Sequence, residues 1–461
     1  MQLQSIPTEL LNRYDIPGPR YTSYPTANLF TENFSEQDFL NALRARTMGA
    51  VTATPMSVYV HIPFCDSLCY YCGCNKIVTK HHELARPYLD KLYMEIEMVA
   101  RQLGSKQKVE QLHFGGGSPT FLTDTELAEL MDVLRKHFEF TPYIESSIEV
   151  DPRTVTPERL QHLWDVGLNR LSFGIQDFNS DVQKAIHREQ STESVFALVK
   201  SAREIGFKSV SVDLIYGLPC QSVDSFMFTI DKIAQLRPDR LAVYGYAHLP
   251  HLFKSQRRIL PEDLPDAATR LNLLSKSIER LQQVGYEYIG MDHFALPEDS
   301  LSLAKRQGRM HRNFQGYSTH ADCDLIGFGV SSISKVGLVY SQNCKDIETY
   351  TQCIDQGHLP VMRGITLDRD DLLRRSVVMA IMCQGEVLYE SIELAFMLDF
   401  KEYFAKEIAQ LESFVEQGFV EIDEDSIKVT QLGMFFVRAL AMTFDRYLQT
   451  PVEQPRFSRI I

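Results

Sequence analysis

The sequence lacks any apolar run long enough to cross a membrane. No stretch approaches the roughly 20 consecutive apolar residues that a membrane-spanning helix requires. The first residues, MQLQSIPTELLNRYDIPGPRYTSYPTA, also lack the basic and then apolar order that marks a secretory signal peptide. We therefore expect a soluble, cytoplasmic protein that has no membrane partner.

Positive charge is scarce in the chain. Its 461 residues include 47 Lys and Arg against 60 Asp and Glu, which gives a formal net charge of −13. A field of that sign disfavours non-specific binding to nucleic acid and to anionic membranes, so we expect no nucleic-acid partner. An anionic small molecule remains compatible with this charge, provided that arginines gather around it.

The cysteines do not form a disulfide framework. Their number is nine, which is odd, and the chain is long and carries no secretory signal. Cys65, Cys69, Cys72 and Cys74 fall within ten residues, whereas the others are scattered as buried small hydrophobic residues would be. The four clustered cysteines therefore need a separate explanation.

Low-complexity tracts and short-period repeats are also absent, but a structural alternation is present. Short apolar runs, typical of buried strands, are separated by amphipathic segments, typical of helices. The expected strands are Ser57–Ile62, Val109–Phe114, Glu145–Val150, Arg170–Ile175, Ser209–Ile215 and Arg240–Tyr246. The expected helices are Ala85–Leu103, Asp124–His137, Pro157–Val166, Ser191–Ile205 and Ser222–Leu236. Alternating strands and helices imply parallel pairing, so the predicted fold class is α/β, a partial (β/α)6 barrel.

Beyond about Thr366 the pattern changes to helix, helix, hairpin and helix. The expected segments are Asp368–Cys383, Phe400–Gln417, Gly418–Thr430 and Leu432–Leu448. They suggest a small, mainly helical domain of winged-helix type, and its acidic EIDEDS turn favours a cap on the barrel over a DNA-binding module. We predict an N-terminal arm with a lead-in helix (1–50), the barrel with an extension (51–365) and this C-terminal domain (366–461).

The cysteine cluster follows the first expected strand in the segment SVYVHIPFCDSLCYYCGCNK. Thiolates suit iron–sulfur clusters, zinc or copper(I), but a zinc site would need a second ligand pair that the sequence does not supply. A cubane cluster normally takes four cysteines, so three ligands leave one iron open to another chelating molecule. Asp66, Ser67, Gly73 and Asn75 mark a polar loop and argue against four core cysteines.

The spacing Cys-x3-Cys-x2-Cys after a first barrel strand resembles the signature of the radical S-adenosylmethionine (SAM) superfamily. That resemblance implies a [4Fe–4S] cluster held by Cys65, Cys69 and Cys72, with SAM on the open iron. It also implies reductive cleavage of SAM to methionine and a 5′-deoxyadenosyl radical.

Further segments narrow the resemblance. PGPRYTSYPTA, YVHIPFC, IYGLPCQ and HRNFQGY are similar to the family of oxygen-independent coproporphyrinogen III oxidases over essentially the whole chain. That family decarboxylates two propionates of coproporphyrinogen III to vinyl groups, which gives protoporphyrinogen IX in haem biosynthesis. The resemblance implies two SAM molecules. We further expect a one-electron donor protein as a partner and a monomeric state. The alternative is the haem chaperone branch, which binds haem without decarboxylation; Cys74 and the N-terminal arm argue against it.

The resemblance also assigns site residues. It places Tyr59, Gly116, Glu149 and Ile333 on the first SAM, and Gly117, Ser118, Gln176, Arg188, Asp213 and Ala247 on the second. It also counts Tyr71 among the cofactor-binding residues. Independently, the ends of parallel barrel strands line the active site, which is where Glu149, Gln176 and Asp213 fall. Because arginine suits carboxylates, Arg20 and Arg312 are expected to bind the substrate propionates, with Tyr21, His311 and Gln315 nearby. The predicted catalytic residues are Tyr59, Glu149, Arg20, Arg312 and Gln315.

Overall fold

The computed structural model describes residues 8–14, 16–48, 54–320, 323–448, 457, 459 and 460. They divide into two compact units. The larger unit comprises Phe30–Ser277 and Asp322–Thr366, and the smaller unit comprises Met1–Leu29, Ile278–Ala321 and Leu367–Ile461. The predicted boundaries at 50/51 and 365/366 stay predictions.

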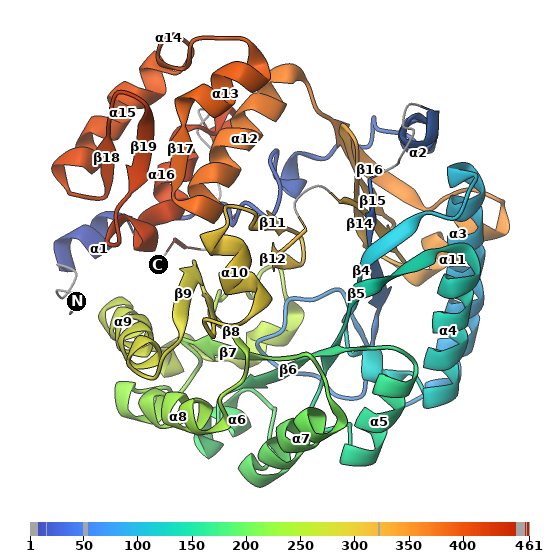
Figure 1. Cartoon of the computed structure of the whole chain (residues 1–461). Helices are drawn as coiled ribbons and strands as arrows, with labels where there is room; N and C mark the ends of the chain where they lie inside the picture. Colours follow the sequence, from blue (N-terminus) through green and yellow to red (C-terminus); the bar gives the residue numbers. More distant parts are fainter. Residues whose placement is uncertain are drawn as a thin grey trace. The chain divides into compact units, whose positions relative to one another are not determined.

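A curved parallel sheet forms the centre of the larger unit (Figure 1). Its parallel strands are, in spatial order, β13 (Asp324–Phe328), β1 (Met56–Ile62), β4 (Lys108–Gly116), β5 (Glu139–Val150), β6 (Arg170–Gln176), β7 (Ser209–Tyr216) and β8 (Arg240–Gly245). The six strands expected from the sequence are all present, and the predicted partial α/β barrel is confirmed.

An antiparallel extension continues this sheet beyond β13. It consists of β14 (Ile333–Val336), β15 (Val339–Asn343) and β16 (Val361–Thr366). A separate small pair joins β2 (Phe64–Cys65) to β3 (Ile77–Val78) and closes the base of the cysteine loop. Neither feature was predicted as strand.

Helices of the larger unit cover the outer face of the sheet (Figure 1). Several begin at caps that the sequence supplies: Thr123 and Glu126 form a capping box for α4, and Ser222 and Ser225 form one for α8. α7 ends where Gly206 takes a left-handed conformation. The helical elements are α2 (Glu36–Met48), η2 (His82–Leu84), α3 (Ala85–Leu103), η3 (Pro119–Phe121), α4 (Asp124–His137), α5 (Pro157–Asp165), α6 (Ser180–Ala185), α7 (Thr192–Ile205), α8 (Val223–Leu236), η4 (Lys254–Arg258), η5 (Pro261–Asp263), α9 (Ala267–Gln283, whose last residues belong to the smaller unit) and α11 (Ile347–Asp355).

The smaller unit is mainly helical, as predicted for the C-terminal part. Its helical elements are α1 (Thr8–Tyr14), η1 (Ala27–Leu29), α10 (Ser300–Arg306), α12 (Arg369–Gln384), α13 (Tyr389–Phe396), α14 (Phe400–Tyr403), α15 (Ala405–Glu416), η6 (Gly433–Phe436), α16 (Val437–Thr443) and η7 (Arg446–Leu448). Its strands form the pairs β9 (Glu287–Gly290) with β10 (His293–Ala295) and β11 (His311–Asn313) with β12 (Gly316–Ser318), and a small sheet of β17 (Glu386–Leu388), β19 (Ser426–Val429) and β18 (Val420–Ile422). The single helix expected over 432–448 is instead broken into η6, α16 and η7.

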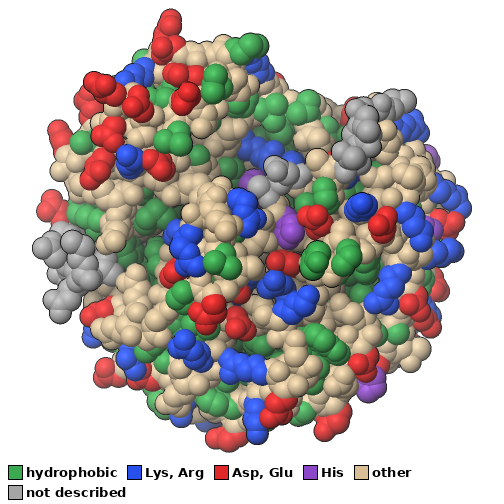
Figure 2. Space-filling model, viewed as in Figure 1, with side chains coloured by type: hydrophobic (Ala, Val, Ile, Leu, Met, Phe, Trp, Pro, Cys, Tyr) green, Lys and Arg blue, Asp and Glu red, His purple; other side chains and the backbone are tan. Residues whose placement is uncertain are grey.

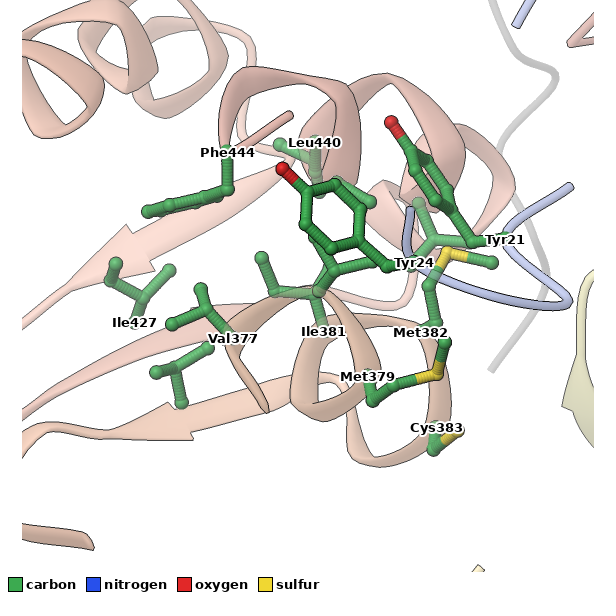
Figure 3. Packing of buried hydrophobic residues seen from close by; sticks show 14 of the residues in the cluster. Tyr21, Tyr24, Val377, Met379, Ile381, Met382, Cys383, Ile427, Leu440 and Phe444 are labelled. Atoms are coloured by element: carbon green, nitrogen blue, oxygen red, sulfur yellow. The ribbon is translucent and has the colours of Figure 1, made fainter. Parts of the chain in front are cut away.

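The core of the smaller unit includes two tyrosines of the N-terminal arm. Tyr21 is 1% exposed and Tyr24 is fully buried, and Figure 3 shows them beside Met382 of α12 and Leu440 and Phe444 near α16. The Tyr21 hydroxyl donates to the Asp445 carboxylate at 2.9 Å. The rings of both tyrosines are therefore enclosed in the core of the smaller unit, and the predicted position of Tyr21 near the substrate stays a prediction.

The surface carries an uneven charge distribution. Acidic side chains gather over the C-terminal helices, whereas acidic and basic groups are mixed over the rest of the visible face (Figure 2). Helices α13, α14 and α15 contribute Glu390, Glu393, Glu402, Glu412 and Glu416. None of the helices in the described part of the chain is long and apolar enough to span a membrane.

Candidate active site

A cavity of about 300 Å³ lies in the larger unit where the parallel strands end. The cysteine loop forms one side of it, and the ends of β4 to β8 supply the rest. This is the edge of an α/β barrel at which ligands bind, because loops that follow every strand converge there. Its lining includes Cys65, Cys69, Cys72, Cys74, Tyr71, Gly116, Gly117, Ser118, Glu149, Gln176, Arg188 and Asp213, together with Asp151, Arg153, Ser172, Gly174 and Tyr244.

Contacts from a distant segment hold the cysteine loop in place. The Ser255 hydroxyl donates to the carbonyl of Cys72 at 2.8 Å, and the Gln256 amide donates to the carbonyl of Tyr71 at 2.8 Å. The three cysteines of the predicted spacing are free thiols on one cavity wall. Soft thiolate ligands grouped in this way fit a [4Fe–4S] cluster.

Cys74 lies close to the other three thiols. Its amide donates to the Cys72 sulfur at 3.4 Å. A hydrogen bond from the Cys74 thiol, with help from Lys76, lowers the pKa of Cys72 to about 5 despite burial. The geometry therefore brings all four cysteines together, and the spacing in the sequence distinguishes the predicted three ligands from Cys74.

The glycine run after β4 allows a close approach to the loop that follows β1. Gly116 has a φ of 118°, and a Cβ at this residue would lie 2.8 Å from the Ile62 carbonyl oxygen. A Cβ at Gly117 would lie 2.7 Å from the Phe64 carbonyl oxygen. Only glycine tolerates both the conformation and the space at Gly116, so the run sets the distance between β4 and the cysteine loop.

Glu149, at the end of β5, turns toward this glycine run. Its carboxylate accepts from the Gly116 amide at 3.3 Å and lies 3.3 Å from His113 Nε2. His113 Nδ1 lies 2.6 Å from the Ser147 hydroxyl, which orients the imidazole. The carboxylate is thus held at the cavity wall while remaining accessible to a ligand.

Polar groups from β6, β7 and the loop after α6 also line this cavity. Gln176 is 7% exposed and has a φ of 70°, a strained conformation for a residue with a side chain. Burial, together with the nearby Glu149 carboxylate, raises the pKa of Asp213 to about 7. Arg188 is 6% exposed and donates to the Gly174 carbonyl at 2.6 Å. Strain and burial of polar groups are concentrated here, as is common at functional sites.

Three predicted cofactor residues lie outside the described lining of the cavity: Tyr59, Ala247 and Ile333. Tyr59 Oη lies 3.1 Å from His61 Nδ1, and its ring stacks on His113 at 5.9 Å between centroids. The Tyr59 ring therefore packs against His113, which in turn lies beside the Glu149 carboxylate. Ile333 begins β14 in the antiparallel extension, and Ala247 follows β8.

Comparison with known proteins identifies the family. A model of the radical SAM superfamily matches residues 59–233, and a model described as the HemN C-terminal domain matches residues 367–436. The oxygen-independent coproporphyrinogen III oxidase of Escherichia coli (strain K12) is 47% identical over 463 residues, covering 100% of both chains. The chain belongs to the oxygen-independent coproporphyrinogen III oxidase family.

Other members of the oxidase family are similar in sequence over nearly the full length of the chain. The proteins of that name from Pseudomonas aeruginosa and Synechocystis are 47% and 42% identical, covering 98% of this chain each and 98% and 97% of their own. The solved structure of the Escherichia coli enzyme matches with a TM-score of 0.91, covering 96% of this chain and 100% of that one. As a radical SAM protein, the chain uses a [4Fe–4S] cluster and SAM. These matches do not favour the haem chaperone alternative.

The residues expected to bind substrate in the oxidase family lie together in the smaller unit. Arg20 pairs with Asp292 at 2.7 Å, and Arg312 Nε donates to the Arg20 carbonyl at 3.1 Å. Arg312 is 3% exposed, and its guanidinium lies 4.6 Å from the Tyr317 ring centroid. Within the described residues, Arg312 Nη1 and Gln315 Nε2 are buried donors with no hydrogen-bond partner.

Sequence reasoning missed Asp151 and Arg153, which line the cavity beside Cys69. They follow Glu149 in the segment SIEVDPR, directly after β5. Both residues could have been predicted as Glu149 was, because charged side chains at or just after the end of a barrel strand are expected to line the active site.

Proposed function

We propose that this protein catalyses the oxygen-independent oxidative decarboxylation of two propionate side chains of coproporphyrinogen III, which gives protoporphyrinogen IX. The observation that carries this proposal is the full-length 47% identity with the Escherichia coli enzyme of that name. The cysteine loop on the cavity at the strand ends supports it. When bound, the cluster and SAM supply an electron and a 5′-deoxyadenosyl radical able to remove hydrogen from a propionate.

In this proposal, one group of cavity residues holds the cluster and another binds the first SAM. Cys65, Cys69 and Cys72 hold the cluster, and the Gly116 and Glu149 wall binds the first SAM through its amino and hydroxyl groups. Glu149 suits this role because its carboxylate is fixed by the Gly116 amide but is not enclosed. Tyr59 and Ile333 stay proposed contacts of the first SAM, and Tyr71 stays a proposed cofactor contact. Ala247 stays a proposed contact of the second SAM.

A second SAM would bind a further set of residues in this cavity. Gly117, Ser118, Gln176, Arg188 and Asp213 all line the same cavity, which supports this arrangement. Gln176 is buried and Asp213 is half-buried, and both side chains can hydrogen-bond to a polar ligand. Two reactions per substrate are the chemical reason for two SAM molecules.

The substrate propionates are the proposed ligands of the smaller unit. Arg312 and Gln315 present buried donors without partners among the described residues, and a carboxylate oxygen is an acceptor that satisfies them. The Arg20 side chain pairs with Asp292, and the Arg20 carbonyl accepts from Arg312 Nε, so we assign Arg20 to positioning Arg312.

Removing the Arg312 side chain should separate SAM cleavage from decarboxylation. Loss of a buried charged contact to a carboxylate costs about 2–5 kcal/mol, so Arg312→Ala should release carbon dioxide at least tenfold more slowly. Carbon dioxide and 5′-deoxyadenosine are measured in the same reaction, and slow 5′-deoxyadenosine formation should persist. Arg309→Ala, at an exposed arginine of the same segment, is the matched control. Equal losses of both products would mean that Arg312 does not bind substrate.

The proposed activity is tested with anaerobic, reduced protein. Given coproporphyrinogen III and SAM, it should yield protoporphyrinogen IX, with two carbon dioxide and at least two 5′-deoxyadenosine per product. Tight haem binding without carbon dioxide release would support a haem chaperone instead. A one-electron donor protein as partner, a monomeric state and a cytoplasmic location stay predictions alongside this proposal.

A further inference from the structure

Two arginines converge on the sulfur of one predicted cluster ligand. Arg188 Nη1 donates to Cys69 Sγ at 3.3 Å, and Arg153 Nη2 donates to the same sulfur at 3.5 Å. Cys69 is 7% exposed, so these N–H groups, rather than water, surround its sulfur. Charge-assisted donors of this kind bind an electron-rich sulfur strongly.

Asp151 fixes both guanidinium groups. Its Oδ2 accepts from Arg153 Nη2 at 2.6 Å and from Arg188 Nη1 at 3.2 Å, and its Oδ1 accepts from Arg153 Nε at 3.0 Å. Arg188 is also tied to the Gly174 carbonyl. The bidentate contact with Asp151 leaves Arg153 little freedom other than to point at Cys69.

A metal-bound sulfur at Cys69 would balance the charge of this group. Arg188 is buried and the Arg153 side chain is 18% exposed; their guanidinium groups repel each other, and Asp151 compensates for only one of them. A metal-bound cysteine is a thiolate and supplies the second negative charge. The four side chains therefore form a balanced set when Cys69 is a ligand, and adding an electron to the cluster places further negative charge beside two cations.

We propose that Arg153, anchored by Asp151, is a positioning residue that raises the reduction potential of the cluster through the Cys69 sulfur; this rests on the proposed function. Hydrogen bonds to cluster sulfurs and nearby positive charge are among the factors that set the potentials of iron–sulfur clusters, and both stabilise the reduced form. Arg188 acts on the same sulfur but is also a proposed SAM contact, so Arg153 isolates the effect.

The test measures the cluster potential of Arg153→Met in the full chain. This change keeps side-chain length but removes the charge and the donors. At a solution potential that reduces half of the wild-type clusters, only about a tenth of the variant clusters should be reduced. That tenfold change in a one-electron equilibrium corresponds to about 59 mV. Spectroscopic redox titration without substrate gives the value, and iron content is measured on the same samples.

Two further variants control the experiment. Arg153→Lys keeps the charge with a different donor geometry and should shift the potential less than Arg153→Met. Arg159→Gln removes an arginine that pairs with Asp124 on the outer helices and should leave the potential unchanged.

Each outcome decides the inference. An unchanged potential in Arg153→Met with full iron content would overturn it. Loss of iron from both Arg153 variants, with iron retained in Arg159→Gln, would also overturn it and assign Arg153 to cluster assembly. Wild-type protein that never binds about four iron atoms would contradict the proposed function instead.

Discussion

Replacing Cys65, Cys69 or Cys72 by serine will remove the bound cluster and abolish SAM cleavage, whereas Cys74→Ser will keep most of the iron. A serine hydroxyl is a harder and far less acidic ligand than a thiol, so each change removes one corner of the cluster. Cys74 must stay off the iron, because SAM needs an open coordination position. Iron content, the visible spectrum of anaerobic protein and 5′-deoxyadenosine formation measure the effect.

Substitution is needed to identify the ligands, because the positions of the four thiols do not distinguish Cys74 from the three predicted ligands. All four cysteines line the same cavity, and the Cys74 amide touches the Cys72 sulfur. Cys220, one of the scattered cysteines expected to be buried, is instead exposed and lies outside the loop. Cys220→Ser is therefore the matched control and should leave the iron unchanged. If Cys74→Ser lost its iron as completely as the other three variants, the three-ligand model would be wrong.

The parallel part of the fold was predictable because local and long-range signals agree there. Apolar runs coincide with β1 and β4 to β8, and side-chain caps such as Thr123 and Ser222 mark the starts of helices. The predicted bounds of α3 and α4 match the structure residue for residue.

The antiparallel extension was not predictable from local pattern. β14 and β15 are short and contain buried polar residues, including Ser334, Gln342 and Asn343, that break apolar alternation. Hydrogen bonds satisfy these groups: Ser334 accepts from the Gly327 amide, and Asn343 donates to Glu95 at 2.6 Å. The first half of β5 was missed for a related reason, since its pairing with β4 is interrupted between Phe140 and Glu145.

The site was predictable where strand direction alone decides the position. Glu149, Gln176 and Asp213 end parallel strands, and the structure brings them to one cavity. The pleat also placed Tyr59 and His61 on one face, and their side chains lie 3.1 Å apart. Loop side chains take their direction from contacts distant in sequence. The sequence therefore gave no indication that Arg20 pairs with Asp292, or that Arg153 points at Cys69.

Tyr24→Ala will destabilise the smaller unit strongly while leaving the cluster in place. Tyr24 is fully buried, and it packs with Ile381, Met382 and Phe444 in the core shown in Figure 3. Truncating a buried aromatic side chain costs about 3–5 kcal/mol through lost burial and the cavity left behind. Denaturant unfolding gives the change in stability, and hydrogen exchange of the amides in α12 and α16 localises it.

Two control variants separate packing from other effects of this change. Tyr24→Phe keeps the ring but loses the acceptor for the Arg446 amide at 3.2 Å, so about 1 kcal/mol should be lost. Tyr143→Ala, at a tyrosine that is 88% exposed, should change stability by less than about 0.5 kcal/mol. The cysteine loop and the strands that carry it belong to the larger unit, so iron content should stay at the wild-type level in all three variants. Wild-type stability in Tyr24→Ala would mean that the arm is not part of the core, and loss of iron would mean that the larger unit depends on the arm.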